Sequence, residues 1–163
     1  MVHNHGSIKG EIMSLPNEVL EALFFAATFG VGPFWILMAL RPHATATRRV
    51  MITPWPVIAL ALVYAVLVLP NLGAILGTLA NPTLSAISTS LATPAGSLAV
   101  WLHVLAFDLI VGRFIWLDGL ERGVGAPLRI ASLALALLIG PIGLLVHLAL
   151  RPRDPRSGSQ AVS

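Results

Sequence analysis

Residues 101–118, WLHVLAFDLIVGRFIWLD, form an apolar stretch that carries four side chains suited to acid–base chemistry. His103 can take up a proton, Asp108 and Asp118 can donate or accept one, and Arg113 can hold a hydroxyl group or a carboxylate. A charged side chain near the centre of a bilayer costs about 2.5–3.5 kcal/mol on insertion scales, so each needs a partner or a polar cavity. These four residues are therefore the candidate catalytic residues, and Asp108 lies nearest the middle of the stretch.

The four side chains do not share one face of the predicted helix. Counted from His103 at about 100° per residue, Asp118 falls at roughly 60° and Asp108 at roughly 140°. Arg113 falls at roughly 280°. An ion pair between Asp108 and Arg113 is not expected, because residues five apart on a helix do not face each other. Each side chain is expected to reach a different neighbouring helix, which places this helix at the centre of the bundle.

A packing role is the alternative for each candidate. Arg113 would then pair between helices or reach towards the membrane surface, and Asp118 would be solvated at that surface. His103 would be a packed or interfacial histidine. His147, in the last apolar run, either lines the same cavity or packs. Asp108 is hardest to explain by packing, because no cation nearby in the sequence faces it.

The composition indicates a membrane protein. Of the 163 residues 56% are hydrophobic and only 10% are charged, with a mean hydropathy of +0.87, whereas soluble domains carry about 25% charged residues. The net charge of +3 is small and scattered, so nucleic acid is not an expected partner. There is no cysteine, which excludes disulfides and thiolate chemistry. No spacing demands a metal, and no nucleotide-binding motif is present, so we expect neither metal nor cofactor.

The apolar runs predict an all-α membrane protein with four transmembrane helices. The expected spans are Val19–Leu40, Val57–Ala80, Ser97–Leu117 and Leu128–Leu150. The first and last are expected to be kinked at Gly32-Pro33 and Gly140-Pro141. The second is either one span kinked at Pro70 or a shorter span followed by a re-entrant segment. The region from Asn81 to Pro94 is expected to be a loop or an interfacial helix. A polar N-terminal tail over 1–18, a transmembrane domain over 19–152 and a disordered C-terminal tail over 153–163 complete the organisation.

Four crossings would place both termini on one side of the membrane. Counted that way, four basic residues lie with the termini and five lie opposite, so the positive-inside rule leaves the orientation open. No targeting segment is recognisable in the polar start of the chain. A bacterial plasma membrane is therefore the expected location.

Two segments carry a resemblance to a known family. Residues 101–115 with Asp118 are similar to W-x-H-x-L-A-F-D-L-F-V-G-R-W-I followed by Asp, and residues 140–145 are similar to G-P-x-G-L-L. These patterns are typical of the small integral-membrane proteins named after the plant abscisic-acid-deficient-four protein, a family associated with neoxanthin synthesis. Ile110 and Phe114 depart from the family's Phe and Trp. The resemblance covers roughly residues 19–152.

The resemblance implies a four-helix membrane protein acting on a carotenoid or another isoprenoid reached from the bilayer. Opening an epoxide to an allenic alcohol is an isomerisation that needs a proton donor and a base but no redox cofactor. Asp108 would be the acid, His103 the base, and Arg113 the group that holds a hydroxyl. Two other classes stay open: a non-catalytic scaffold or partner of a membrane enzyme, and a small proton-coupled transporter, which would need a homo-oligomer.

Overall fold

The computed structural model describes residues 15–152, and within this range the chain is helical, with no strand. The helices are α1 Asn17–Gly30, α2 Gly32–Leu40, α3 Thr45–Ile52, α4 Trp55–Val68, the 3₁₀ turn η1 Leu69–Asn71, α5 Leu72–Ala80, α6 Leu84–Leu91, α7 Pro94–Glu121, α8 Ala126–Ile139 and α9 Pro141–Leu150. The expected C-terminal tail over 153–163 and the first 14 residues of the expected N-terminal tail lie outside the described residues. Three helical segments are long and apolar enough to cross a membrane: Asn17–Leu40, Trp55–Ala80 and Pro94–Glu121.

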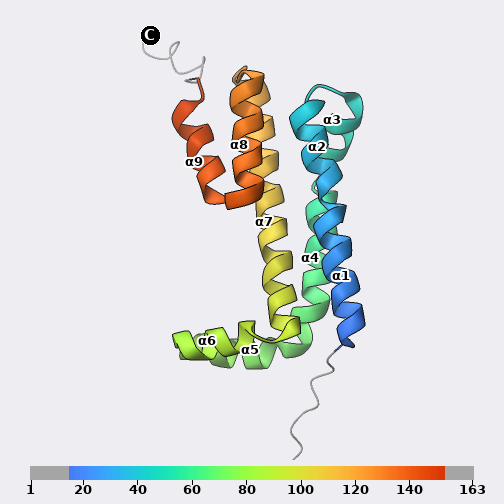
Figure 1. The fold of residues 1–163 in the computed structure, drawn as a ribbon, viewed down its shortest axis with the longest axis vertical. Helices are drawn as coiled ribbons and strands as arrows, with labels where there is room; N and C mark the ends of the chain where they lie inside the picture. The colour runs from blue at the N-terminus through green and yellow to red at the C-terminus, as the bar shows by residue number, and fades with distance from the viewer. Residues whose placement is uncertain (1–14, 153–163) are drawn as a thin grey trace, which may run out of the picture.

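The long helix α7 is the central element of the fold. It packs against α1, α2, α4, α6, α8 and α9 (Figure 1). The helix begins with Pro94, which has no backbone N–H to leave unpaired, and the Thr93 hydroxyl accepts a hydrogen bond from the backbone N–H of Gly96 at 3.1 Å. This central position is the one expected for a helix whose polar side chains point in several directions.

The first span consists of α1 and α2, separated by the single residue Val31. Pro33 lies in the first turn of α2, where the missing N–H removes no necessary hydrogen bond. The interruption therefore lies at Val31, directly before the Gly32-Pro33 pair at which the sequence predicts a kink. Beyond it, the ring of Trp35 lies so close to Gly112 of α7 that an added side-chain carbon there would be 2.6 Å from it. A glycine at position 112 thus lets the first span approach the central helix.

The second apolar run bends at its proline. Helix α4 ends at Val68, Pro70 lies in η1, and Figure 1 shows α5 and α6 pointing sideways, away from the axis of α4 and α7. The Asn71 side chain donates a 3.0 Å hydrogen bond to the carbonyl of Leu67 and so satisfies a backbone group at the bend. The structure thus turns the second half of the predicted span across the end of the bundle. The pair α5 and α6, which is called the shelf below, includes the helix that the sequence predicted as an alternative to a loop.

The last apolar run differs most from its prediction. The sequence predicts one kinked crossing over Leu128–Leu150, whereas the structure folds this segment into a hairpin in which α9 returns alongside α8 (Figure 1). The chain reverses at Gly140, whose φ of +40° and ψ of −98° form a backbone conformation that residues other than glycine rarely adopt. Gly143 brings the two backbones together, since an added carbon there would lie within 2.5 Å of the Ser132 carbonyl oxygen.

The hairpin changes the expected topology. Helix α1 begins at one end of the molecule, whereas α9 ends at the other (Figure 1), so the first and last described helices do not lie as four crossings would place them. The end where α9 finishes also carries the arginines of α3 and the arginine that follows α2, and it is called the arginine end below. Its arginines within the described residues are Arg41, Arg48, Arg49, Arg113, Arg122, Arg129 and Arg151. Within the described residues the arginines therefore gather at one end, whereas four crossings would have divided them between two sides. The positive-inside rule then predicts that the arginine end faces the side of the membrane on which positive charge is retained.

Candidate functional site

Asp108 lies at the tip of the α8/α9 hairpin, about halfway along α7. One of its carboxylate oxygens is 3.0 Å from the point that a side-chain carbon on Gly140 would occupy. Gly140 is buried and also precedes the first turn of α9, whose backbone N–H groups are not all paired within the helix. Among residues 15–152 no group forms a hydrogen bond or ion pair with the Asp108 carboxylate. The Asp108 carboxylate therefore lies at the hairpin tip without a hydrogen bond or ion pair to the described residues.

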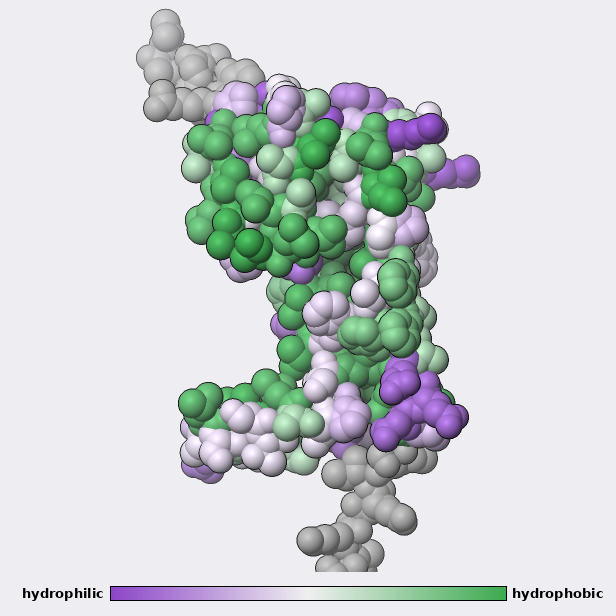
Figure 2. Space-filling view, in the orientation of Figure 1, coloured by the Kyte–Doolittle hydropathy of each residue, from purple (hydrophilic) through white to green (hydrophobic). Residues whose placement is uncertain are grey.

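A hollow opens in the outline of the molecule next to the tip of the α8/α9 hairpin. Figure 2 shows it between the block formed by the hairpin and the shelf at the opposite end. Three exposed apolar residues lie on one face of α7, on the stretch between its start and Asp108: Val100, Val104 and Phe107, which are 41%, 40% and 56% exposed. This surface, called the notch below, is apolar. If α7 crosses a bilayer, the notch lies at the level of the hydrocarbon core. It suits an elongated apolar molecule lying against α7.

His103 lies on the other side of the notch residues from Asp108, because Val100, Val104 and Phe107 fall between the two in angle around the helix. Its ring stacks on Phe107 with a centroid distance of 4.5 Å and lies 5.9 Å from the ring of Tyr64 on α4. At about 1.5 Å rise per residue, His103 and Asp108 are separated by roughly 7.5 Å along α7. The two groups therefore flank the notch rather than contact each other.

Arg113 has a structural contact at the arginine end. Its Nε–H donates to the Met51 carbonyl, and one terminal N–H donates to the Ile52 carbonyl at 2.7 Å. These are the last carbonyls of α3, which have no partner inside that helix. Arg113 therefore caps α3 and holds it against α7, as the packing alternative expects.

Asp118 forms the centre of an ion-pair network between α7 and α9. One carboxylate oxygen accepts a 2.8 Å hydrogen bond from His147, which is fully buried. The other accepts hydrogen bonds from Arg122 at 2.9 Å and from Arg151 at the end of α9. This network fixes the returning arm of the hairpin to the central helix. His147 therefore belongs with Asp118, at a distance from Asp108.

The four predicted residues thus divide into two groups. His103 and Asp108 border the notch, whereas Arg113 and Asp118 join helices at the arginine end. Arg113 reaches α3 and Asp118 reaches α9, whereas Asp108 lies beside the hairpin tip with no hydrogen-bond partner among the described residues. Within residues 15–152 no group of three or more His, Cys, Asp or Glu side chains is placed to hold a metal ion.

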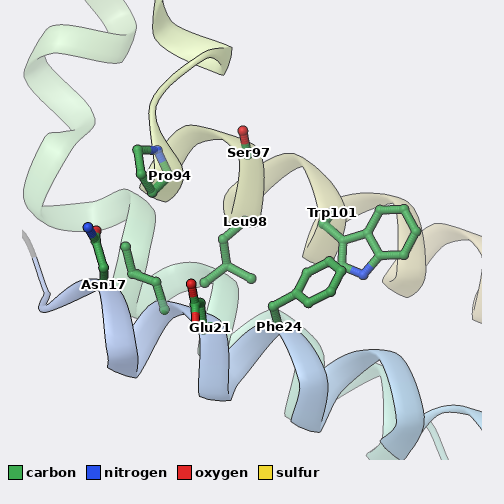
Figure 3. Close-up of a pocket in the computed structure, with 8 residues that line it drawn as sticks. Asn17, Glu21, Phe24, Pro94, Ser97, Leu98 and Trp101 are labelled. Atoms are coloured by element: carbon green, nitrogen blue, oxygen red, sulfur yellow. The ribbon is translucent and has the colours of Figure 1, made fainter.

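A groove that the sequence does not predict lies between the start of α1 and the start of α7. The groove has a volume of about 380 Å³. Figure 3 shows Asn17 and Glu21 reaching from α1 towards α7, with Phe24 beside Trp101. The signal for it was the spacing of Asn17 and Glu21, which are four residues apart and so lie on one face of α1. A second groove of about 250 Å³ lies between the first span and α4 and is lined almost entirely by apolar residues.

Comparison with known proteins agrees with the resemblance noted in the sequence. Residues 22–147 match the family described as ABA DEFICIENT 4-like. The chain is similar to "Protein ABA DEFICIENT 4, chloroplastic" from Arabidopsis thaliana, with 27% identity over 148 aligned residues. The alignment covers 80% of this chain and 60% of the relative's length, so the chain spans less than two thirds of that protein. No solved structure matches the chain.

The comparison corrects the expected location. The curated relative is a chloroplastic plant protein, which contradicts the expectation of a bacterial plasma membrane. That expectation rested on the absence of a recognisable targeting segment, and such an absence does not identify a membrane. Because the family match covers most of the chain, including both segments that carry the resemblance, this protein belongs to the ABA DEFICIENT 4-like family.

Proposed function

We propose that this chain is an integral-membrane enzyme that takes an epoxide-bearing carotenoid or related isoprenoid from the bilayer and isomerises it at the notch. Family membership and the apolar helices support this proposal. The observation that carries it is the Asp108 carboxyl group, which lies at the hairpin tip beside an exposed apolar wall and has no partner among the described residues. A carboxyl group in such surroundings is a natural proton donor, because an apolar environment disfavours its charged form.

The proposed reaction opens the epoxide to an allenic alcohol. The acid delivers a proton to the epoxide oxygen as one carbon–oxygen bond breaks. A base removes a proton from the neighbouring chain carbon, and the electrons of that carbon–hydrogen bond form the new double bond of the allene. One proton is gained and one is lost, so the product is an isomer of the substrate and no electrons leave the molecule.

Asp108 is the proposed acid and His103 the proposed base. Their separation of roughly 7.5 Å along α7 leaves space for a small ring between them. The stacking of His103 on Phe107 fixes one face of the imidazole, so that its ring orientation is set before substrate arrives. Phe107 and Val104 would contact the hydrocarbon part of the substrate. The bilayer is the proposed partner from which the substrate enters.

Arg113 and Asp118 act at a distance from the notch in this proposal. Arg113 keeps α3 against α7, and Asp118 keeps α9, and with it Gly140, in place. Both are positioning residues. Their loss should lower activity in proportion to the loss of folded protein, whereas loss of Asp108 should remove activity from protein that is folded normally.

The test is pigment profiling in carotenoid-producing cells that contain epoxy-carotenoids. Cells expressing wild type, Asp108→Asn or an empty vector are compared at matched protein levels by chromatography and mass spectrometry. We expect an isomeric product of unchanged mass with wild type only. Identical profiles in all three would argue against isomerisation at Asp108.

A non-catalytic role in a membrane assembly is the second candidate. It is favoured by the observation that Arg113 and Asp118, two of the four intramembrane polar residues, already have structural partners. This role predicts that Asp108→Asn leaves the pigment profile unchanged while the protein remains bound to a membrane enzyme. Co-purification of such an enzyme with both wild type and Asp108→Asn would support it.

A further inference from the structure

The groove between α1 and α7 combines polar and aromatic side chains at the end of the molecule opposite the arginine end (Figure 3). Asn17 and Glu21 supply its polar side, and Phe24, Leu98 and Trp101 supply its apolar side. No residue among 15–152 forms an ion pair with Glu21. We propose that this groove binds the hydroxylated ring of an amphipathic molecule whose apolar chain lies in the bilayer.

The aromatic side of the groove is held in place before any ligand binds. The indole N–H of Trp101 donates a 2.8 Å hydrogen bond to the Thr28 hydroxyl, which itself donates to the Phe24 carbonyl at 2.7 Å. The rings of Phe24 and Trp101 lie 5.5 Å apart. Because the indole donor is already used, Trp101 offers a ligand only its apolar ring surface. A rigid wall of this kind reduces the entropy lost on binding a flat or ring-shaped group.

The polar side of the groove selects among head groups. An ionised Glu21 accepts hydrogen bonds and repels phosphate, so anionic lipids fit poorly. The Asn17 amide both donates and accepts. A quaternary ammonium could neutralise Glu21 but has no hydrogen-bonding group for Asn17. A hydroxylated ring satisfies both side chains, because each hydroxyl group donates and accepts.

This groove is distinct from the notch. Trp101 precedes Asp108 by seven residues, which is roughly 10 Å along the helix. A ring held between Glu21 and Trp101 would therefore not reach the Asp108 carboxylate. The proposed binding stands whether or not the notch is catalytic.

Two sources could supply a hydroxylated ring: the end of a hydroxylated carotenoid or the sugar head of a glycolipid. The test uses purified full-length protein in detergent and two matched ligand pairs. One pair is a dihydroxylated carotenoid and its hydrocarbon counterpart, followed by quenching of tryptophan fluorescence. The other pair is a galactosyl diacylglycerol and diacylglycerol, followed by native mass spectrometry. We expect the hydroxylated member of one pair to bind about tenfold more tightly, as loss of a hydrogen bond to a charged group predicts.

Two variants connect the preference to the groove. Glu21→Ala should remove the roughly tenfold preference, whereas Glu18→Ala, an exposed glutamate on the same helix outside the groove, should keep it. Asp108→Asn should also keep it, which separates this result from any loss of chemistry at the notch. Circular dichroism confirms that each variant is folded. Equal binding within both ligand pairs, or equal binding by Glu21→Ala and Glu18→Ala, would overturn the proposal.

Discussion

The carboxylate of Asp108 on the central helix lies 3.0 Å from the point where a side chain on Gly140 would begin, at the tip of the α8/α9 hairpin. The reversal of the chain and the position of the acid therefore depend on each other. A glycine allows the backbone to turn, and its missing side chain leaves the space that the carboxylate occupies. The hairpin thus determines both where the last apolar segment reverses direction and which groups surround Asp108.

Replacing Gly140 should weaken this arrangement. Gly140→Ala introduces a side chain at φ +40° and brings it against the Asp108 carboxylate, so we expect a loss of about 1–3 kcal/mol in unfolding free energy. Denaturant titration in detergent micelles measures it. The matched control is Gly73→Ala, because an added carbon at Gly73 meets no atom within 4 Å. If the two variants unfold alike, Gly140 does not have the role described.

The hairpin also makes a topological prediction that the cysteine-free chain makes easy to test. Single cysteines at Glu18, Glu121 and Pro152, all exposed positions, can be labelled from one side of sealed vesicles with a membrane-impermeant maleimide. We expect Glu121→Cys and Pro152→Cys to react from the same side and Glu18→Cys from the other. A complete fourth crossing would instead place Pro152 with Glu18.

Asp118 should be a major source of stability. Asp118→Asn removes the negative charge shared by His147, Arg122 and Arg151, and removing one partner from such a largely buried network costs about 3 kcal/mol. Glu18→Gln, an exposed change, should cost less than about 0.5 kcal/mol. The same micelle titration compares the two. A small effect at Asp118 would show that α9 is held by apolar packing alone.

Arg113 should control the order of α3 rather than the chemistry. Arg113→Ala leaves two carbonyls at the end of α3 without their donors, so amide hydrogen exchange in residues 45–52 should accelerate by about tenfold, the equivalent of roughly 1.4 kcal/mol. Arg48→Ala, on the exposed side of α3, serves as the control. Unchanged exchange together with lost activity would instead place Arg113 at the reacting site.

Much of the fold could be predicted from the sequence because bilayer thickness limits the possible answers. Apolar runs, bounding prolines and the polar pattern of residues 101–118 identified the central helix and the first span. Leu128–Leu150 was long enough for a crossing, and length alone cannot distinguish a kinked helix from a hairpin. The distinction depends on a positive φ at Gly140 and on the close approach at Gly143, and neither is encoded in hydropathy.

The candidate site was predictable only in part. The angles around one helix correctly separated Arg113 from Asp108, because helical geometry is regular. The pairing of Asp118 with His147 could not be foreseen, since it depends on the path of the returning hairpin arm. The groove at Glu21 joins α1 to α7 across a long sequence separation, and the spacing of Asn17 and Glu21 on α1 does not show which helix they face.

The central claim is that Asp108 donates a proton to a substrate at the notch. The most direct measurement incubates purified protein in lipid vesicles with an epoxy-carotenoid and separates the products by chromatography and mass spectrometry. Wild type should form an isomer of unchanged mass, Glu18→Gln should match wild type, and Asp108→Asn should lose at least about a hundredfold in rate, the usual contribution of a general acid. Product formation by Asp108→Asn at the wild-type rate would contradict the claim.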